Sequence, residues 1–176
     1  MALERHCPIL QIVGYQNSGK TTAVEALIKS LSGQGFRVAA IKHHGHGGRP
    51  DPGMRGKDSE RHEGAGAIAA GVHGEDRLQL SLPGNWALSS IITFYEALSP
   101  DFIVVEGYKK EKYPKVLVLG SAADKDLLKS AVNVKAVIVS DRELLNIHSD
   151  SPVFMLSDKT IYVRYLQKVM TEENKK

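Results

Sequence analysis

One short stretch, GYQNSGKT at residues 14–21, limits the fold of this chain more than any other part of its sequence. Its spacing, G-x-x-x-x-G-K-T, is that of a loop that wraps phosphate groups with backbone N–H groups and one lysine. The apolar run ILQIV precedes it at residues 9–13, and residues 21–34 carry apolar side chains at helical spacing. We therefore expect a strand, a phosphate-binding loop and a helix N-terminus, in the order that such a site requires.

The residue types in this loop agree with phosphate chemistry. Gly14 and Gly19 permit backbone turns that bulkier residues resist. Lys20 is expected to reach the β- and γ-phosphates of a nucleotide, and Thr21 to place its hydroxyl on Mg²⁺. The other nucleotide contacts that we predict in the loop are Gln16, Asn17, Ser18 and Thr22.

The rest of the chain alternates between apolar runs and helical patterns. Strands are expected at 37–42, 67–72, 77–82, 101–106, 115–120, 135–139 and 152–156, and helices from 58, over 87–98, over 125–130 and after 158. This alternation predicts an α/β fold of the P-loop NTPase type, a three-layer sandwich with helices on both faces of a mostly parallel sheet. We expect one domain over residues 1–176, with a mobile Gly/Pro/His-rich loop at about 44–58.

Composition narrows the class of protein. The net charge of +3 is too small to indicate nucleic-acid binding, and no run approaches the roughly 20 apolar residues that a membrane span needs. A single cysteine, Cys7, cannot form an internal disulfide, which fits a reducing compartment. We therefore expect a soluble, cytoplasmic protein.

Glu106 is the predicted metal-side carboxylate. It follows the apolar run FIVV, and P-loop proteins keep such an acid at a strand end to hold Mg²⁺ or its waters. We assign Glu106 a metal and catalytic role. Asp58, or Asp51, is a further candidate for the magnesium shell, and Asp58 is the second predicted catalytic residue.

The segment IKHHGHGGRPDPGMRGKDSERH, residues 41–62, is basic and rich in histidine and glycine. Beside a phosphate loop it would form an electropositive rim. A transition-metal site is an alternative, with His44 and His46 as the better pair because alternate residues of a strand share a face. A third ligand could come only through the fold, from Cys7 or His62.

Asp141 follows the apolar run AVIV, at a position where a carboxylate could read guanine. An aspartate can accept hydrogen bonds from guanine N1–H and the N2 amine, which adenine lacks. No Asn-Lys-x-Asp motif accompanies it, so adenine and guanine both remain open on these residues alone.

Several segments together resemble one family. GYQNSGKTT, IKH, GKDSERHEGAGA, VVEGYK, PKVLVL and VSD, in this order and spacing over most of residues 9–141, resemble the molybdopterin-guanine dinucleotide biosynthesis protein B (MobB) family. The resemblance implies a P-loop fold, binding of GTP with Mg²⁺, weak intrinsic hydrolysis and a homodimer. It also implies an adaptor that assists the molybdenum cofactor guanylyltransferase in joining GMP to molybdopterin. By the same resemblance, Lys42, His43 and residues 56–62 would lie close to the nucleotide.

Two other classes of protein compete with this interpretation. A P-loop small-molecule kinase would use Arg49, Arg55 and Arg61 as a phosphate-gripping lid. A GTPase metallochaperone would bind Ni²⁺ or Zn²⁺ at His44 and His46. Whether the chain is an enzyme is left open, since the family implies at most a weak Mg-dependent GTPase.

Overall fold

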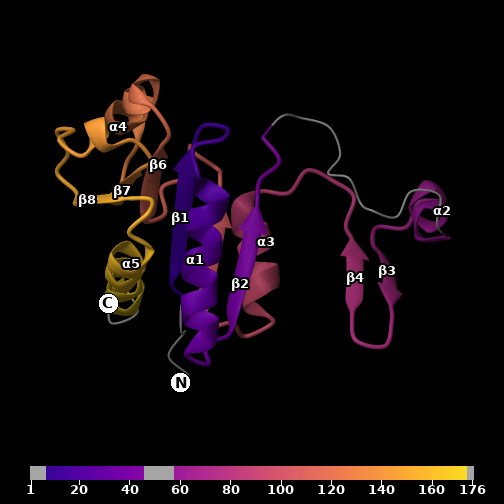
Figure 1. Ribbon diagram of the computed structural model, residues 1–176. Coiled ribbons are helices and arrows are strands. Elements are labelled where there is room, and N and C mark those ends of the chain that lie inside the picture. Colours follow the sequence, from indigo (N-terminus) through magenta and orange to yellow (C-terminus); the bar gives the residue numbers. More distant parts are fainter. Residues whose placement is uncertain (1–6, 46–57, 174–176) are drawn as a thin grey trace. The chain divides into compact units, whose positions relative to one another are not determined.

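The computed structural model describes residues 7–45 and 58–173 (Figure 1). These residues fall into two compact units. The first unit runs up to Gly45 and resumes at Ile92, and the second ends at Ile91. The predicted loop at about 44–58 lies almost wholly outside the described residues, as do His46, Arg49, Asp51 and Arg55.

The first unit is built on a six-stranded sheet in the order β2-β5-β1-β6-β7-β8, in which every pair of neighbours is parallel. The strands are β1 (Ile9–Gly14), β2 (Val38–Lys42), β5 (Phe102–Glu106), β6 (Lys115–Leu119), β7 (Val134–Val139) and β8 (Val153–Met155). β1 lies between β5 and β6, so the residues that follow β1 and β5 meet at one edge of the sheet.

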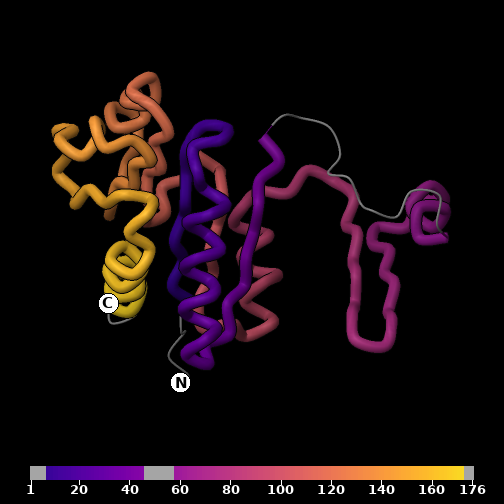
Figure 2. Tube along the Cα trace, in the orientation of Figure 1, coloured from indigo at the N-terminus to yellow at the C-terminus, as the bar shows by residue number. Residues whose placement is uncertain are grey.

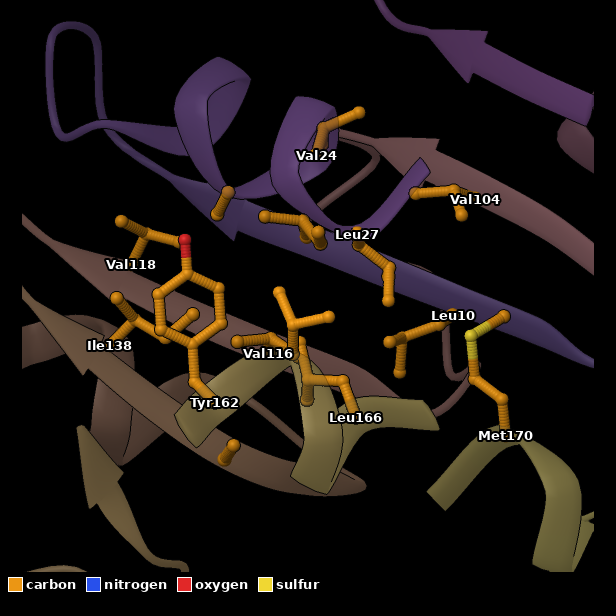
Figure 3. Packing of buried hydrophobic residues seen from close by; sticks show 14 of the residues in the cluster. Leu10, Val24, Leu27, Val104, Val116, Val118, Ile138, Tyr162, Leu166 and Met170 are labelled. Carbon is orange, nitrogen blue, oxygen red and sulfur yellow. The ribbon is translucent and has the colours of Figure 1, made fainter. Parts of the chain in front are cut away.

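One face of this sheet is covered by α1 (Lys20–Gly33) and α5 (Lys159–Glu173), which also contact each other. Ala23, Leu27 and Leu166 are fully buried there. Figure 3 shows these helices meeting the sheet, with Tyr162 of α5 among the strand side chains. Full burial of a leucine side chain stabilises a fold by roughly 1.5–3 kcal/mol.

The opposite face carries a second apolar cluster, in which Leu127 of α4 (Asp126–Ser130) and Leu144 pack with Val13, Leu117 and Val137. Two short 3₁₀ helices belong to this part of the chain. η1 (Ala122–Lys125) directly precedes α4, and η2 (Arg142–Leu144) follows β7. The predicted α/β architecture, a mostly parallel sheet with helices on both faces, is therefore confirmed.

The second unit contains α2 (Asp58–Gly64) and an antiparallel hairpin of β3 (Ala70–His73) and β4 (Leu78–Ser81). Figure 2 follows the chain through the turn between these two strands. α3 (Leu88–Glu96) begins in this unit and continues into the first. β3 begins three residues later than its sequence pattern predicts, and Ile68 before it is 89% exposed.

Near the helix starts, Asp58 and Ser59 lie inside α2, and Asn85 lies three residues before α3. Asp158 does directly precede α5, and its carbonyl accepts the N–H groups of Ile161 and Tyr162. Over residues 7–45 and 58–173, the helices are all too short or too polar to cross a membrane.

Candidate functional site

The phosphate motif forms the turn between β1 and α1, as its spacing predicts. Asn17 and Gly19 both have positive φ, 59° and 97°, and Gly19 occupies the N-cap position of α1. A Cβ at Gly19 would lie 2.4 Å from a methyl group of Leu156, so both backbone conformation and space favour glycine. The loop thus delivers the chain directly into a helix N-terminus, where free N–H groups and the helix dipole favour anions.

The base of the loop is closely packed. A Cβ at Gly14 would lie 2.4 Å from the carbonyl oxygen of Val118 and 2.5 Å from Ser18 Oγ. Ser18 is 2% exposed, and its hydroxyl has no hydrogen-bond partner among the residues described. A buried polar atom without a partner is costly unless a ligand completes its hydrogen bonding.

Lys20 is the half-buried cation of the loop. Its ammonium donates a hydrogen bond to the carbonyl oxygen of Tyr15, across the turn. Burial lowers the pKa of Lys20; Glu106 opposes this, and Lys109 and Lys42 lower it further. The side chain therefore ends in a neighbourhood that already holds other ammonium groups, as a polyphosphate site would need.

Glu106 lies at the end of β5 with its carboxylate largely buried. Thr21 Oγ1 lies 3.2 and 3.3 Å from its two oxygens, and Lys42 Nζ lies 3.4 Å from Oε1. The strand register explains this, because Glu106 faces Ile12 of β1 on one side and Lys42 of β2 on the other. Thr21, Glu106 and Lys42, three of the predicted site residues, are brought together.

The backbone of the loop after β5, residues 107–112, accepts hydrogen bonds from two buried side chains of the sheet. The Gln11 side-chain amide donates to the carbonyl oxygens of Gly107 and Tyr108, at 3.1 and 2.9 Å. Lys115 is fully buried and donates to the carbonyl oxygens of Lys109, at 3.4 Å, and Glu111. Gln11 and Lys115 face each other on β1 and β6, so one polar pair fixes the loop.

Two side chains of this loop, those of Tyr108 and Lys109, turn toward the site. The ring centroids of His43 and Tyr108 lie 4.4 Å apart, and the backbone N–H of His43 donates to the carbonyl oxygen of Glu106. Lys109 Nζ lies 3.8 Å from the ring centroid of Tyr15 in the phosphate loop. His43 therefore borders Glu106 through its backbone, and its predicted position close to the nucleotide remains a prediction.

The other predicted contacts are more scattered. Gln16 and Asn17 are exposed in the turn, and Thr22 lies in the first turn of α1. Asp141 follows β7, two strands from β1, and its carboxylate accepts the N–H of Glu143 as the N-cap of η2. Its predicted guanine contact remains a prediction.

Asp58 belongs to the second unit, where its carboxylate lies 3.4 Å from Arg61 within α2. Both side chains are exposed, so this pair contributes little to stability. The proposed lid residue Arg61 is thus engaged with the second predicted catalytic acid. Among the residues described, no group of three or more His, Cys, Asp or Glu side chains could hold a metal ion.

Sequence reasoning missed three buried polar residues, Gln11, Lys115 and Asp124. Asp124 accepts the N–H groups of Gly120 and Ser121, at 2.6 and 3.2 Å, beside Ser18. The sequence does mark the first two, because each is a polar residue in an otherwise apolar strand. Gln11 interrupts ILQIV, and Lys115 begins KVLVL. Polar side chains inside such strands indicate a buried hydrogen-bonding role.

Comparison with known proteins places these features in a family. The family described as "Molybdopterin guanine dinucleotide synthesis protein B" (MobB) matches residues 9–141. A protein of Bacillus subtilis (strain 168), named "Probable molybdopterin-guanine dinucleotide biosynthesis adapter protein", is 44% identical over 158 residues, which cover 90% of this chain and 91% of that protein. A "Molybdopterin-guanine dinucleotide biosynthesis adapter protein" of Haemophilus influenzae is 33% identical, over 83% of this chain and 85% of its own.

A solved structure agrees with the sequence comparison. "The Crystal structure of Bacillus subtilis MobB" superposes with a TM-score of 0.81 and 38% identity, covering 93% of this chain and 98% of that one. From its sequence and its fold, the chain belongs to the MobB family.

Proposed function

We propose that this chain is an adapter protein of molybdopterin guanine dinucleotide biosynthesis that binds GTP with Mg²⁺. Membership in the MobB family supports the adapter role, because the relatives above carry that name. The observation that carries the nucleotide proposal is the convergence of Thr21, Lys42 and Glu106 on the loop that presents Lys20.

The residues present fit a nucleotide triphosphate. Ser18 Oγ is a buried group without a described partner, and glycine at position 14 lets the loop pack closely there, because a Cβ would lie 2.5 Å from that hydroxyl. Lys20 supplies a fixed positive charge at the N-terminus of α1. These features support phosphate binding by residues 14–22.

The residues also fit a magnesium ion. A carboxylate and a hydroxyl are the oxygen ligands that Mg²⁺ prefers, and those of Glu106 and Thr21 are within 3.3 Å of each other. When bound, the ion supplies charge neutralisation between the β- and γ-phosphates. The ammonium of Lys42 pairs with the carboxylate of Glu106. Because the Lys42 side chain is exposed, it has room to move away from Glu106 when a metal ion binds there.

The choice of GTP follows the family rather than a guanine motif. Asp141 is the proposed guanine contact. Its described side-chain hydrogen bond, from the N–H of Glu143, leaves the carboxylate able to accept further hydrogen bonds. Hydrolysis is proposed to be weak, with Glu106 and Asp58 as the acidic residues that would take part in it. The proposed compartment is the cytoplasm.

The proposed protein partners are the molybdenum cofactor guanylyltransferase and a second copy of this chain. The hairpin of β3 and β4 exposes apolar side chains, with Leu78 59% and Leu80 47% exposed. A two-stranded hairpin is marginally stable on its own in water. Exposed leucines on such a unit support a role in contact with another protein.

The adapter role can be tested by reconstitution. Purified guanylyltransferase, molybdopterin and Mg·GTP would be incubated with and without this chain, and molybdopterin guanine dinucleotide would be measured over time. We expect the wild-type chain to accelerate formation and Lys20→Ala to lose most of that effect. Formation at the same rate with and without the chain, over a range of enzyme concentrations, would contradict the adapter role.

A further inference from the structure

We propose that Lys109 is a specificity-determining residue of the site, whose ammonium binds the terminal phosphate of a nucleoside triphosphate. This inference rests on the proposed function, since it assumes that residues 14–22 hold a nucleotide. It concerns a residue outside that motif, contributed by the loop that follows β5.

Lys109 lies beside the phosphate loop. Its ammonium lies 3.8 Å from the centroid of the Tyr15 ring, while the carbonyl oxygen of the same tyrosine accepts a hydrogen bond from Lys20. One residue thus holds both cations, one at its ring and one at its backbone. Lys109 also lowers the pKa of Lys20, as expected of two nearby ammonium groups. Since Lys20 is the residue that reaches the β- and γ-phosphates, Lys109 lies at the same end of the ligand.

The backbone of the loop that carries Lys109 is held by two side chains of the sheet. Gln11 binds the carbonyl oxygens of Gly107 and Tyr108, and Lys115 binds those of Lys109 and Glu111. Both side chains that hold the loop are fully buried in the sheet. The backbone of Lys109 is therefore fixed by hydrogen bonds from side chains of the sheet, whereas its own side chain is exposed to solvent. A fixed backbone with a movable charged tip reduces the entropy lost when the ammonium takes a ligand.

The ammonium of Lys109 has two possible partners, the Tyr15 ring and a phosphate oxygen. An exposed cation–π contact such as that with Tyr15 is weak, typically changing an equilibrium by about two- to fivefold. A charge-assisted hydrogen bond to a phosphate oxygen is stronger, because the acceptor is itself charged. Lys109 is therefore expected to leave the tyrosine ring when a terminal phosphate is present, and to stay on it when only a diphosphate is bound.

The test is a calorimetric titration of wild type and Lys109→Met with Mg·GTP and with Mg·GDP. Methionine keeps the alkyl chain and removes the charge. The matched control is Lys110→Met, which removes the same charge from the exposed neighbour in the same loop. We expect Lys109→Met to weaken GTP binding by about tenfold or more and GDP binding by less than threefold, with Lys110→Met changing both by less than threefold.

The possible results separate this inference from the proposed function. A wild-type chain that binds neither nucleotide would overturn the proposed function and the inference with it. If wild type binds GTP and Lys109→Met matches Lys110→Met, only the inference is overturned. If Lys109→Met weakens GTP and GDP binding equally, Lys109 does not recognise the terminal phosphate, and the inference is overturned as well.

Discussion

At the scale of single residues, Glu106 places one buried carboxylate between the hydroxyl of Thr21 and the ammonium of Lys42. A carboxylate among phosphates is repulsive unless a cation shares the space. Lys42 is such a cation, with its ammonium 3.4 Å from Oε1 of Glu106. In the proposed complex a magnesium ion would neutralise the carboxylate, and Lys42 would be released toward solvent or phosphate.

Glu106→Gln is expected to separate metal binding from phosphate binding. The amide keeps the shape of the side chain but loses its charge, so the Mg²⁺ concentration needed for half-maximal GTP binding should rise about tenfold or more. GTP binding in the presence of a metal chelator should stay the same or improve, because a repulsive charge has gone. Calorimetric titrations at a series of Mg²⁺ concentrations measure both.

The control for this substitution is Glu143→Gln, which removes a carboxylate from the exposed start of η2. It should leave the magnesium dependence unchanged. If Glu106→Gln and wild type respond to Mg²⁺ in the same way, Glu106 does not belong to the metal site.

At the scale of elements, the loop after β5 is held by a fully buried ammonium, that of Lys115. Burial lowers the pKa of Lys115, and Glu111 opposes this. Between the lowered pKa of the folded state and the ordinary value of 10.5, the unfolded chain binds more protons than the folded chain. Stability contributed through Lys115 therefore rises as the pH rises through this interval.

Lys115→Met isolates this effect, because wild type and variant share all other titrating groups. The free energy of unfolding of wild type, minus that of the variant, should increase from neutral pH toward pH 10.5. Urea unfolding at a series of pH values measures the difference. A difference that falls or stays constant over this interval would show that the charge of Lys115 carries no such burial cost.

The sequence could predict the elements of the first unit better than the contacts between them. Strand and helix periodicity located β1, α1, β5, β6 and β7, and the motif placed Lys20 and Thr21 at the start of a helix. Glu106 was found because an acid follows an apolar run. Gln11 and Lys115 were not found, because their role depends on β6 lying beside β1, and strand order is not encoded in local periodicity.

At the scale of the whole molecule, the two compact units differ in how they are stabilised. The first has two apolar clusters on opposite faces of a six-stranded sheet. The second is built around a two-stranded hairpin with exposed leucines. The second unit is therefore the one expected to gain stability from another protein.

The proposed homodimer gives a measurable consequence. Leu78→Glu with Leu80→Glu places two charges on the exposed face of the hairpin, so the chain should become monomeric at concentrations where wild type is a dimer. Sedimentation equilibrium reports the mass. Ile161→Glu on α5 is the control, because Ile161 is also 59% exposed but lies outside the hairpin. A wild type that is monomeric throughout, or a double variant that still dimerises, would contradict this interface.

This member of the MobB family is proposed to hold GTP on the loop that presents Lys20. The most direct test is a calorimetric titration of the purified chain with Mg·GTP and with Mg·ATP, beside Lys20→Ala. We predict binding with a clear preference for GTP, and loss of that binding in the variant, because the loop would lose its fixed cation. Equal binding of the two nucleotides, a preference for ATP, or undiminished GTP binding by Lys20→Ala would contradict the claim.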